Sequence, residues 1–204
     1  MAGLRALNKA DRSRRILDSA SRLFRQAGYD AVRIEDIAAE ARLSPGTVYN
    51  HFETKGDILL AIVAMEVEEV LAAGDALLAD PPRDIEAALN ALIGGYYGHS
   101  LNYLSKPMWR TAMAQSIAAP GATFSVAYTA LDRRLTDQVC RLLAILQAQG
   151  RVRPDIDARA FGEIVFNDIN NMFIEFVKND AQPLEDLQES MRRHHALWAR
   201  VAAV

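Results

Sequence analysis

Apolar residues recur along the chain at spacings of three and four, and no stretch of useful length alternates apolar with polar residues. Spacings of three and four place side chains on one face of a helix, whereas alternation is the pattern of a strand. We therefore expect an all-α chain of about nine helices. The first apolar stripe ends at Gly28. The fourth helix is expected to begin after Lys55 and to end at Asp80. The later helices are expected to span residues 84–104, 106–118, 123–149, 157–178 and 183–203.

The segment from Ile34 to Lys55 predicts two short helices joined by a tight turn. The first helix has one apolar face, made by Ile34, Ile37, Ala38 and Ala41. Ser44 followed by Pro45 marks the start of the second helix, because Ser can cap a helix and Pro fits its first position. Val48 and Phe52 can face the core while the other positions stay polar. This is the arrangement that helix-turn-helix proteins present to the major groove of DNA.

The same residues resemble the DNA-binding signature of the TetR (tetracycline-repressor) family of bacterial regulators. The resemblance rests on Ile37-Ala38 and on Ser44-x-Gly46-Thr47-Val48-Tyr49-x-His51-Phe52-x-x-Lys55, and it extends over about residues 13–60. It implies a helix-turn-helix head over residues 1–56, with residues 1–12 as a basic arm. It also implies a larger helical body over residues 57–204 that binds an effector and dimerises.

Two positions depart from the family pattern. Arg33 stands where the family usually has a Thr or Ser that caps the first helix of the motif. Glu35 and Asp36 in the first turn would offset part of that loss. Arg42 stands where a Gly is common, so a positive φ at this position would strain the backbone.

The resemblance and the chemistry of the side chains together predict the DNA contacts. Thr47 and Asn50 suit base edges, whereas Tyr49, His51 and Lys55 suit phosphates. Lys55 would gain from the adjacent helix N-terminus, which is itself an anion site. The predicted DNA-binding residues are Arg33, Ser44, Pro45, Gly46, Thr47, Tyr49, Asn50, His51 and Lys55. The alternative for each is a solvated side chain, and the arm is either a disordered terminus or a further contact to the backbone or minor groove.

The charge distribution favours nucleic-acid binding by the N-terminal part. The 204-residue chain has a net charge of −3, but residues 1–55 hold ten Lys and Arg against seven Asp and Glu. A basic head joined to an acidic body suits a DNA reader. The single cysteine, Cys140, excludes an intrachain disulfide, and we interpret it as a small apolar residue on a helix. The N-terminus lacks the apolar core of a signal peptide, so we expect a cytoplasmic protein without a membrane segment.

Residues 161–177 are apolar on most faces, which requires packing partners on several sides. Together with the final helix they predict a four-helix seam between two copies of the chain. The predicted interface residues are Phe166, Phe173, Leu184, Leu187, Met191 and Trp198. Two-fold symmetry would place the two reading helices one DNA turn apart and require a palindromic operator. The alternative is a buried helix in a monomer.

The body also contains aromatic residues that could wall a small-molecule pocket. The candidate pocket residues are Tyr96, Tyr97, His99, Tyr103, Trp109, Met113, Phe124, Tyr128, Asn167, Asn170 and Asn171. The aromatic residues could equally form plain core, and the asparagines could set the register of a dimer.

No catalytic constellation is recognisable. Gly98 to Asn102 lacks the second Gly of a hydrolase elbow, and the adjacent His194 and His195 point to different sides of a helix. We therefore expect no enzyme activity, no cofactor and no metal.

Taken together, these features predict a ligand-responsive, dimeric DNA-binding transcriptional regulator. The expected mode is a repressor that a small, largely apolar or aromatic effector releases from a palindromic double-stranded DNA operator. The alternatives are an all-α small-molecule-binding protein or enzyme that retains the motif, and a DNA binder that responds to no effector.

Overall fold

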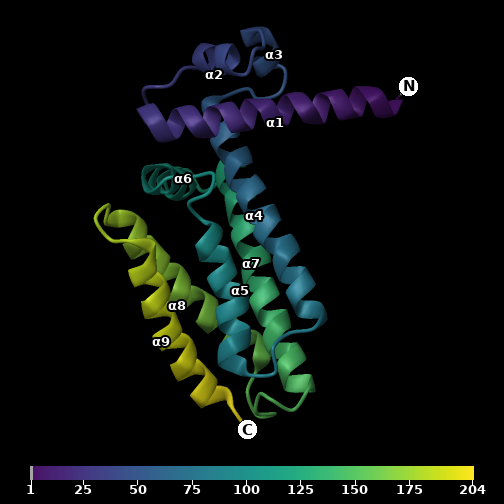
Figure 1. Ribbon diagram of the computed structural model, residues 1–204, viewed down its shortest axis with the longest axis vertical. Helices are drawn as coiled ribbons and strands as arrows, with labels where there is room; N and C mark the ends of the chain where they lie inside the picture. The colour runs from purple at the N-terminus through teal and green to yellow at the C-terminus, as the bar shows by residue number, and fades with distance from the viewer. Residues whose placement is uncertain (1) are drawn as a thin grey trace. The chain divides into compact units, whose positions relative to one another are not determined.

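The computed structural model describes residues 2–204, with side chains from residue 9 onward. Within these residues the chain forms nine α-helices and no strand, so the all-α expectation is confirmed (Figure 1). The helices are α1 (Ala2–Ala27), α2 (Ile34–Glu40), α3 (Pro45–Tyr49), α4 (Lys55–Ala79), α5 (Ile85–His99), α6 (Lys106–Ala118), α7 (Thr123–Ala148), α8 (Ala158–Lys178) and α9 (Leu184–Ala202).

Short-range signals set most of the helix ends at the predicted places. Gly28 ends α1 with φ +86°, and its N–H donates to the carbonyl of Phe24 at 3.0 Å. This left-handed conformation favours glycine because it has no Cβ. At the start of α5, a carboxylate oxygen of Asp84 accepts from the N–H of Ala87 at 2.7 Å.

Two helix ends lie elsewhere than the sequence pattern places them. Residues 2–12, which the sequence assigns to a basic arm, are part of α1. This part of the sequence is rich in Ala, Leu, Lys and Arg, which have high helix propensity. Helix α5 ends at His99 and not at residue 104, because the hydroxyl of Ser100 donates to the carbonyl of Tyr97 at 2.7 Å and closes a tighter turn.

The chain divides into two compact units, and the division falls inside α4 and α7. The first unit contains the residues up to Met65 together with Asn102–Tyr128, and the second contains Glu66–Leu101 together with Thr129–Val204. The units therefore divide the chain differently from the predicted domains, since α6 joins the N-terminal helices. The predicted functional division between residues 56 and 57 stays a prediction.

The first unit buries one face of each of its N-terminal helices. Helix α2 packs against both α1 and α3. The fully buried side chains of the first unit include Ile16, Phe24, Ile37, Val48, Ile58, Leu59 and Ile62. These are the apolar positions that the spacing of three and four marks in the sequence, so the motif rests on a packed core.

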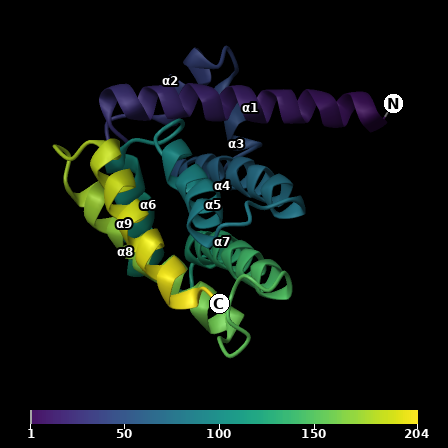
Figure 2. The same ribbon diagram turned by 60° about the horizontal axis from the view of Figure 1, so that its bottom comes forward.

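The second unit places α9 beside α5 and beside α8, and Figure 2 shows α8 and α9 running together along the chain's C-terminal part. Helices α7 and α8 approach closely at Gly162. A Cβ at Gly162 would lie 2.6 Å from the Sγ atom of Cys140 and 2.8 Å from its Cα. Only a residue without a side chain fits at this contact.

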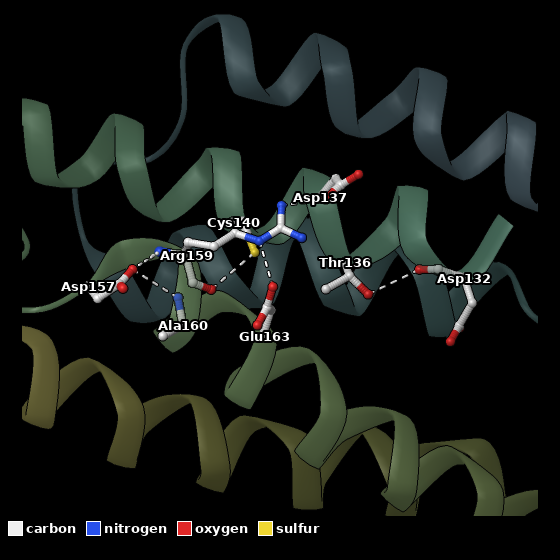
Figure 3. A network of polar contacts seen from close by, with 8 residues as sticks. All are labelled: Asp132, Thr136, Asp137, Cys140, Asp157, Arg159, Ala160 and Glu163. Atoms are coloured by element: carbon white, nitrogen blue, oxygen red, sulfur yellow. Dashed lines mark hydrogen bonds and ion pairs between the residues drawn. The ribbon is translucent and has the colours of Figure 1, made fainter. Parts of the chain in front are cut away.

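A polar network beside this contact ties α7 to α8 (Figure 3). The guanidinium of Arg159 donates to Asp137 of α7 at 2.6 Å and to Glu163 of α8 at 2.6 Å. The Sγ atom of Cys140 donates to the carbonyl of Arg159 at 3.4 Å. Cys140 is 6% exposed, and burial raises the pKa of its thiol. The interpretation of Cys140 as a small buried helix residue is therefore confirmed.

Candidate nucleic-acid interface

The turn between α2 and α3 is built on a left-handed residue. Arg42 has φ 54°, and among the described residues it is the one non-glycine with a positive φ. The N–H of Leu43 donates to the carbonyl of Ala38 at 2.8 Å, and the N–H of Arg42 donates to the carbonyl of Ala39 at 3.0 Å. These bonds close the end of α2 in the way that usually requires glycine. The position does need a positive φ, so Arg42 carries the strain that its place in the sequence indicates.

Helix α3 begins with the cap that the sequence predicts. The hydroxyl of Ser44 accepts from the N–H of Thr47 at 3.2 Å, and Pro45 occupies the first turn. The hydroxyls of Ser44 and Thr47 lie 2.8 Å apart. The Thr47 hydroxyl is thus already engaged at the cap, which leaves its methyl group as the part suited to a thymine.

Helix α3 turns its apolar side inward and its polar side outward. Val48 is fully buried, whereas Tyr49 is 48% exposed and Asn50 is exposed. Gly46 is also exposed, so the backbone of this face is accessible. The outer face therefore offers an amide, a phenol and a bare backbone, which are groups that can approach base edges and phosphates.

The end of the motif lies near the basic part of α1. Burial, followed by the positive charges of Lys9 and Arg12, lowers the pKa of His51. His51 is thus suited to donate a hydrogen bond as a neutral ring. The sequence assigns Lys9 and Arg12 to the basic arm, and their spacing of three on a helix places them on a common face.

Arg33 precedes α2 without a side-chain cap, as the sequence indicates. Asp36 compensates, because its carboxylate accepts from the backbone N–H of Arg33 at 2.9 Å. The Arg33 residue is exposed. Its guanidinium can therefore serve an outside partner such as a phosphate.

Lys55 has partners that the sequence did not indicate. Its ammonium donates to the carbonyl oxygens of Tyr29 at 2.7 Å, Val32 at 3.1 Å and Asp30 at 3.2 Å. It also lies 4.4 Å from the centre of the Tyr29 ring, within the range of a cation–π interaction. The predicted phosphate contact of Lys55 stays a prediction, but it would have to compete with these carbonyls.

The side chains predicted to form the dimer seam are mostly inside the chain. Phe166, Phe173, Leu187 and Met191 are buried within a single copy, and Leu184 and Trp198 are half-buried. A residue that its own chain already covers has little surface left for a second copy, so Leu184 and Trp198 are the more accessible of the six, and the interface stays a prediction. The exposed apolar residues of α8 and α9 are Ile164, Leu197 and Val201. The spacing of four between residues 197 and 201 was the available signal.

The predicted pocket residues fall in both compact units. Tyr103, Trp109, Met113, Phe124 and Tyr128 belong to the first unit, and Tyr96, Tyr97, His99, Asn167, Asn170 and Asn171 belong to the second. In the first unit, Tyr103 lines an open hollow beside Arg22 and Arg25. The backbone carbonyl of Tyr103 accepts from the hydroxyl of Ser21 at 2.5 Å.

In the second unit, the ring of His99 lines a cavity of about 190 Å³. Its Nδ1 lies 2.6 Å from Glu66, and its Nε2 lies 3.3 Å from Glu69. The hydroxyl of Tyr96 instead donates to Gln138 at 2.6 Å in a buried position, and burial raises the pKa of Tyr96. The hydroxyl of Tyr96 thus has its hydrogen-bond partner inside the protein.

Two other kinds of site are absent from the described residues. No group of three or more His, Cys, Asp or Glu there is arranged to hold a metal ion. None of the helices there combines the length and the apolarity needed to cross a membrane.

Comparison with known proteins agrees with the geometry of the motif. The sequence profile described as "Bacterial regulatory proteins, tetR family" matches residues 16–62. The HTH-type transcriptional repressor KstR of Rhodococcus jostii is 35% identical over 60 residues, which cover 29% of this chain and 28% of that protein. The likeness to this curated relative is thus confined to less than a third of its length.

Solved structures extend the likeness to the whole fold. A putative TetR-family transcriptional regulator from Mesorhizobium loti covers 96% of this chain and 98% of its own, with a TM-score of 0.75 and 18% identity. Thermus thermophilus FadR, a TetR-family repressor in complex with lauroyl-CoA, covers 90% of this chain and 93% of its own, with a TM-score of 0.60 and 22% identity. These relatives are regulators and not enzymes. Residues 16–62 of this chain thus match the N-terminal domain of the tetR family of bacterial regulatory proteins, and the chain as a whole shares the fold of these solved structures.

Proposed function

We propose that the protein is a ligand-responsive, dimeric DNA-binding transcriptional regulator that acts as a repressor. The observation that carries the proposal is α3, a capped helix whose inner residue Val48 is buried while Tyr49 and Asn50 face outward. The N-terminal match to a repressor of Rhodococcus jostii supports the sign of regulation. Its expected place of work is the cytoplasm, where bacterial DNA lies.

A second copy of the chain is part of the proposal. Ile164, Leu197 and Val201 are 52%, 49% and 46% exposed, so these apolar side chains of α8 and α9 are accessible to a second copy. A two-fold pair formed through these faces of α8 and α9 would present two α3 helices to DNA. The operator is then palindromic, with half-sites about 34–36 Å apart.

The effector is proposed to be a small, largely apolar or aromatic molecule. A repressor of similar fold holds lauroyl-CoA, which shows that this architecture can accept a ligand with a long apolar part. Binding must stabilise one arrangement of the dimer more than the other, since a ligand shifts an equilibrium only by its differential affinity. Helix α4 contains residues of both compact units, and we assign to it the transmission of the effect of the ligand.

The test measures binding of the purified protein to the DNA upstream of its own gene, by fluorescence anisotropy at several salt concentrations. The expected result is saturable binding that prefers this DNA over a scrambled duplex and weakens steeply with salt, as phosphate contacts require. Asn50→Ala should reduce the preference by the share that one base pair contributes. Binding that shows no preference, or no salt dependence, would exclude the regulator and favour a ligand-binding protein that only retains the motif.

A further inference from the structure

We propose that Lys55 is a positioning residue that fixes the α1–α2 turn to the first turn of α4, and thereby sets the placement of α2 and α3. The inference rests on the proposed DNA-binding function. It differs from the phosphate contact that the sequence favours, because it assigns the charge of Lys55 to the protein's own backbone.

The ammonium of Lys55 has three N–H donors, and three carbonyl oxygens converge on it. Those of Tyr29, Asp30 and Val32 lie 2.7, 3.2 and 3.1 Å from Nζ. The bonds to Tyr29 and Val32 are partly buried. A phosphate could therefore accept a hydrogen bond from Lys55 only if one of these partly buried bonds to a carbonyl were broken.

The backbone that carries Lys55 is itself held in place. The N–H of Thr54 donates to the carboxylate of Asp57 at 2.8 Å, and the N–H of Asp57 donates to the hydroxyl of Thr54 at 3.1 Å. This reciprocal pair caps the N-terminus of α4. Because the cap fixes the start of α4, the ammonium holds a defined position relative to that helix.

The turn that Lys55 holds leads directly into the reading pair. Val32 is buried and Arg33 follows it as the N-cap of α2. The ring of Tyr29 also packs at 5.1 Å from that of Phe24, and its hydroxyl accepts from Gln115 of α6 at 3.5 Å. Helices α1, α4 and α6 thus meet at Tyr29, and a displacement of the first turn of α4 displaces the entry to α2.

The experiment compares Lys55→Met with Lys9→Met in the full-length protein. Both variants lose one positive charge and keep most of the side-chain stem, but Lys9 is exposed. The probes are a duplex enriched by the wild-type protein from a randomised DNA pool and a scrambled duplex of the same composition. Affinity is measured at several salt concentrations, and hydrogen exchange is measured by mass spectrometry over residues 29–40.

For Lys55→Met we expect the preference for the selected duplex to fall about tenfold or more, while the slope of log affinity against log salt stays unchanged. A lost phosphate contact would instead lower that slope by about 0.9. Amides of residues 29–40 should exchange faster in Lys55→Met and not in Lys9→Met. Lys55→Arg should lose part of the preference as well, because a planar guanidinium cannot direct its donors to the same three carbonyls.

A reduced slope of log affinity against log salt, with an unchanged preference for the selected duplex, would overturn the proposal. It would show that Lys55 contacts a DNA phosphate. Unchanged exchange over residues 29–40 would overturn it also. If Lys55→Met fails to fold, Lys55→Arg decides through its preference and its hydrogen exchange, because it keeps the charge and changes only the donor geometry. If the wild-type protein selects no DNA, the proposed function fails, and hydrogen exchange alone then decides whether Lys55 holds the turn.

Discussion

The ammonium of Lys55 lies 2.7 Å from the carbonyl oxygen of Tyr29, so a residue at the end of the helix-turn-helix segment holds the loop that precedes it. The two residues are 26 positions apart in the chain. The contact joins the start of α4 to the turn that precedes α2. Helices α2 and α3 lie between these two segments in the sequence. The reading helix is therefore placed by the whole first unit and not by the short turn alone.

Replacing Arg42 with glycine should stabilise the protein. Arg42 has φ 54°, and a left-handed conformation costs a non-glycine residue about 1 kcal/mol or more. Arg42→Gly should therefore raise the free energy of unfolding by about 1 kcal/mol, less the entropy that glycine adds to the unfolded chain. Urea denaturation of the two proteins measures the difference, and a clear loss of stability in the variant would show that the Arg42 side chain makes a compensating contact.

Asn50→Ala should lose discrimination at a single base pair. Asn50 is exposed on the outer side of α3, and a bidentate Asn–adenine pair is worth about 1–3 kcal/mol of discrimination. Anisotropy with duplexes substituted one base pair at a time should show one position that the variant no longer distinguishes. A uniform loss over all duplexes would instead assign Asn50 to the DNA backbone.

Val201→Asp should weaken self-association. Val201 is 46% exposed on α9, and a charge placed in an interface between two copies would be buried without a partner. We expect the dissociation constant of the dimer to rise about tenfold or more, measured by analytical ultracentrifugation. Val126→Asp is the matched control, because Val126 is 60% exposed on α7 and outside the proposed seam. Equal effects of the two substitutions would refute this seam.

Stability should decrease as the pH falls below about 6.5, through His195. Burial, and then the neighbouring His194, lower the pKa of His195 to about 4, while Asp168 acts in the opposite direction. The unfolded chain binds the proton near pH 6.5, so it takes up more protons than the folded protein between pH 6.5 and 4. The contribution of His195 is complete above pH 6.5 and is lost toward pH 4, by up to about 3 kcal/mol.

Urea denaturation at several pH values, with His195→Gln as the comparison, checks this contribution. The Nδ1 of His195 lies 2.7 Å from the side-chain oxygen of Asn90, and its Nε2 is buried without a partner in the structure. The variant cannot titrate, so its stability should vary less over this pH range. The same pH dependence in both proteins would assign the effect to other groups.

Gly162→Ala should destabilise the second unit by about 1–3 kcal/mol, since the added Cβ would overlap Cys140, including its backbone. Gly95→Ala provides the opposite case, because no atom lies within 4 Å of a Cβ there. That substitution should stabilise α5 by about 0.5–1 kcal/mol through helix propensity. Thermal unfolding of both variants tests the pair, and a neutral Gly162→Ala would mean that α7 and α8 can separate at little cost.

The sequence predicts the helices well, because each is specified by short-range periodicity and by local end signals such as Gly28 and Ser44. The sequence alone selects the interface residues less sharply, for a physical reason. Residues 161–177 are apolar on most faces, so the sequence does not indicate which face of α8 the chain covers itself, for example by its packing against α9. The partners of Lys55 are backbone carbonyls, which every residue has. No pattern of side chains in the sequence can therefore predict them.

The single thiol of the chain offers a built-in reporter of motion. Cys140 is covered where α7 and α8 are closest, and burial disfavours the thiolate that a labelling reagent attacks. In the folded protein it should react slowly with such a reagent, and only when these two helices part. The rate of modification of the unaltered protein therefore measures how often this contact opens, and a ligand that tightens the second unit would slow it.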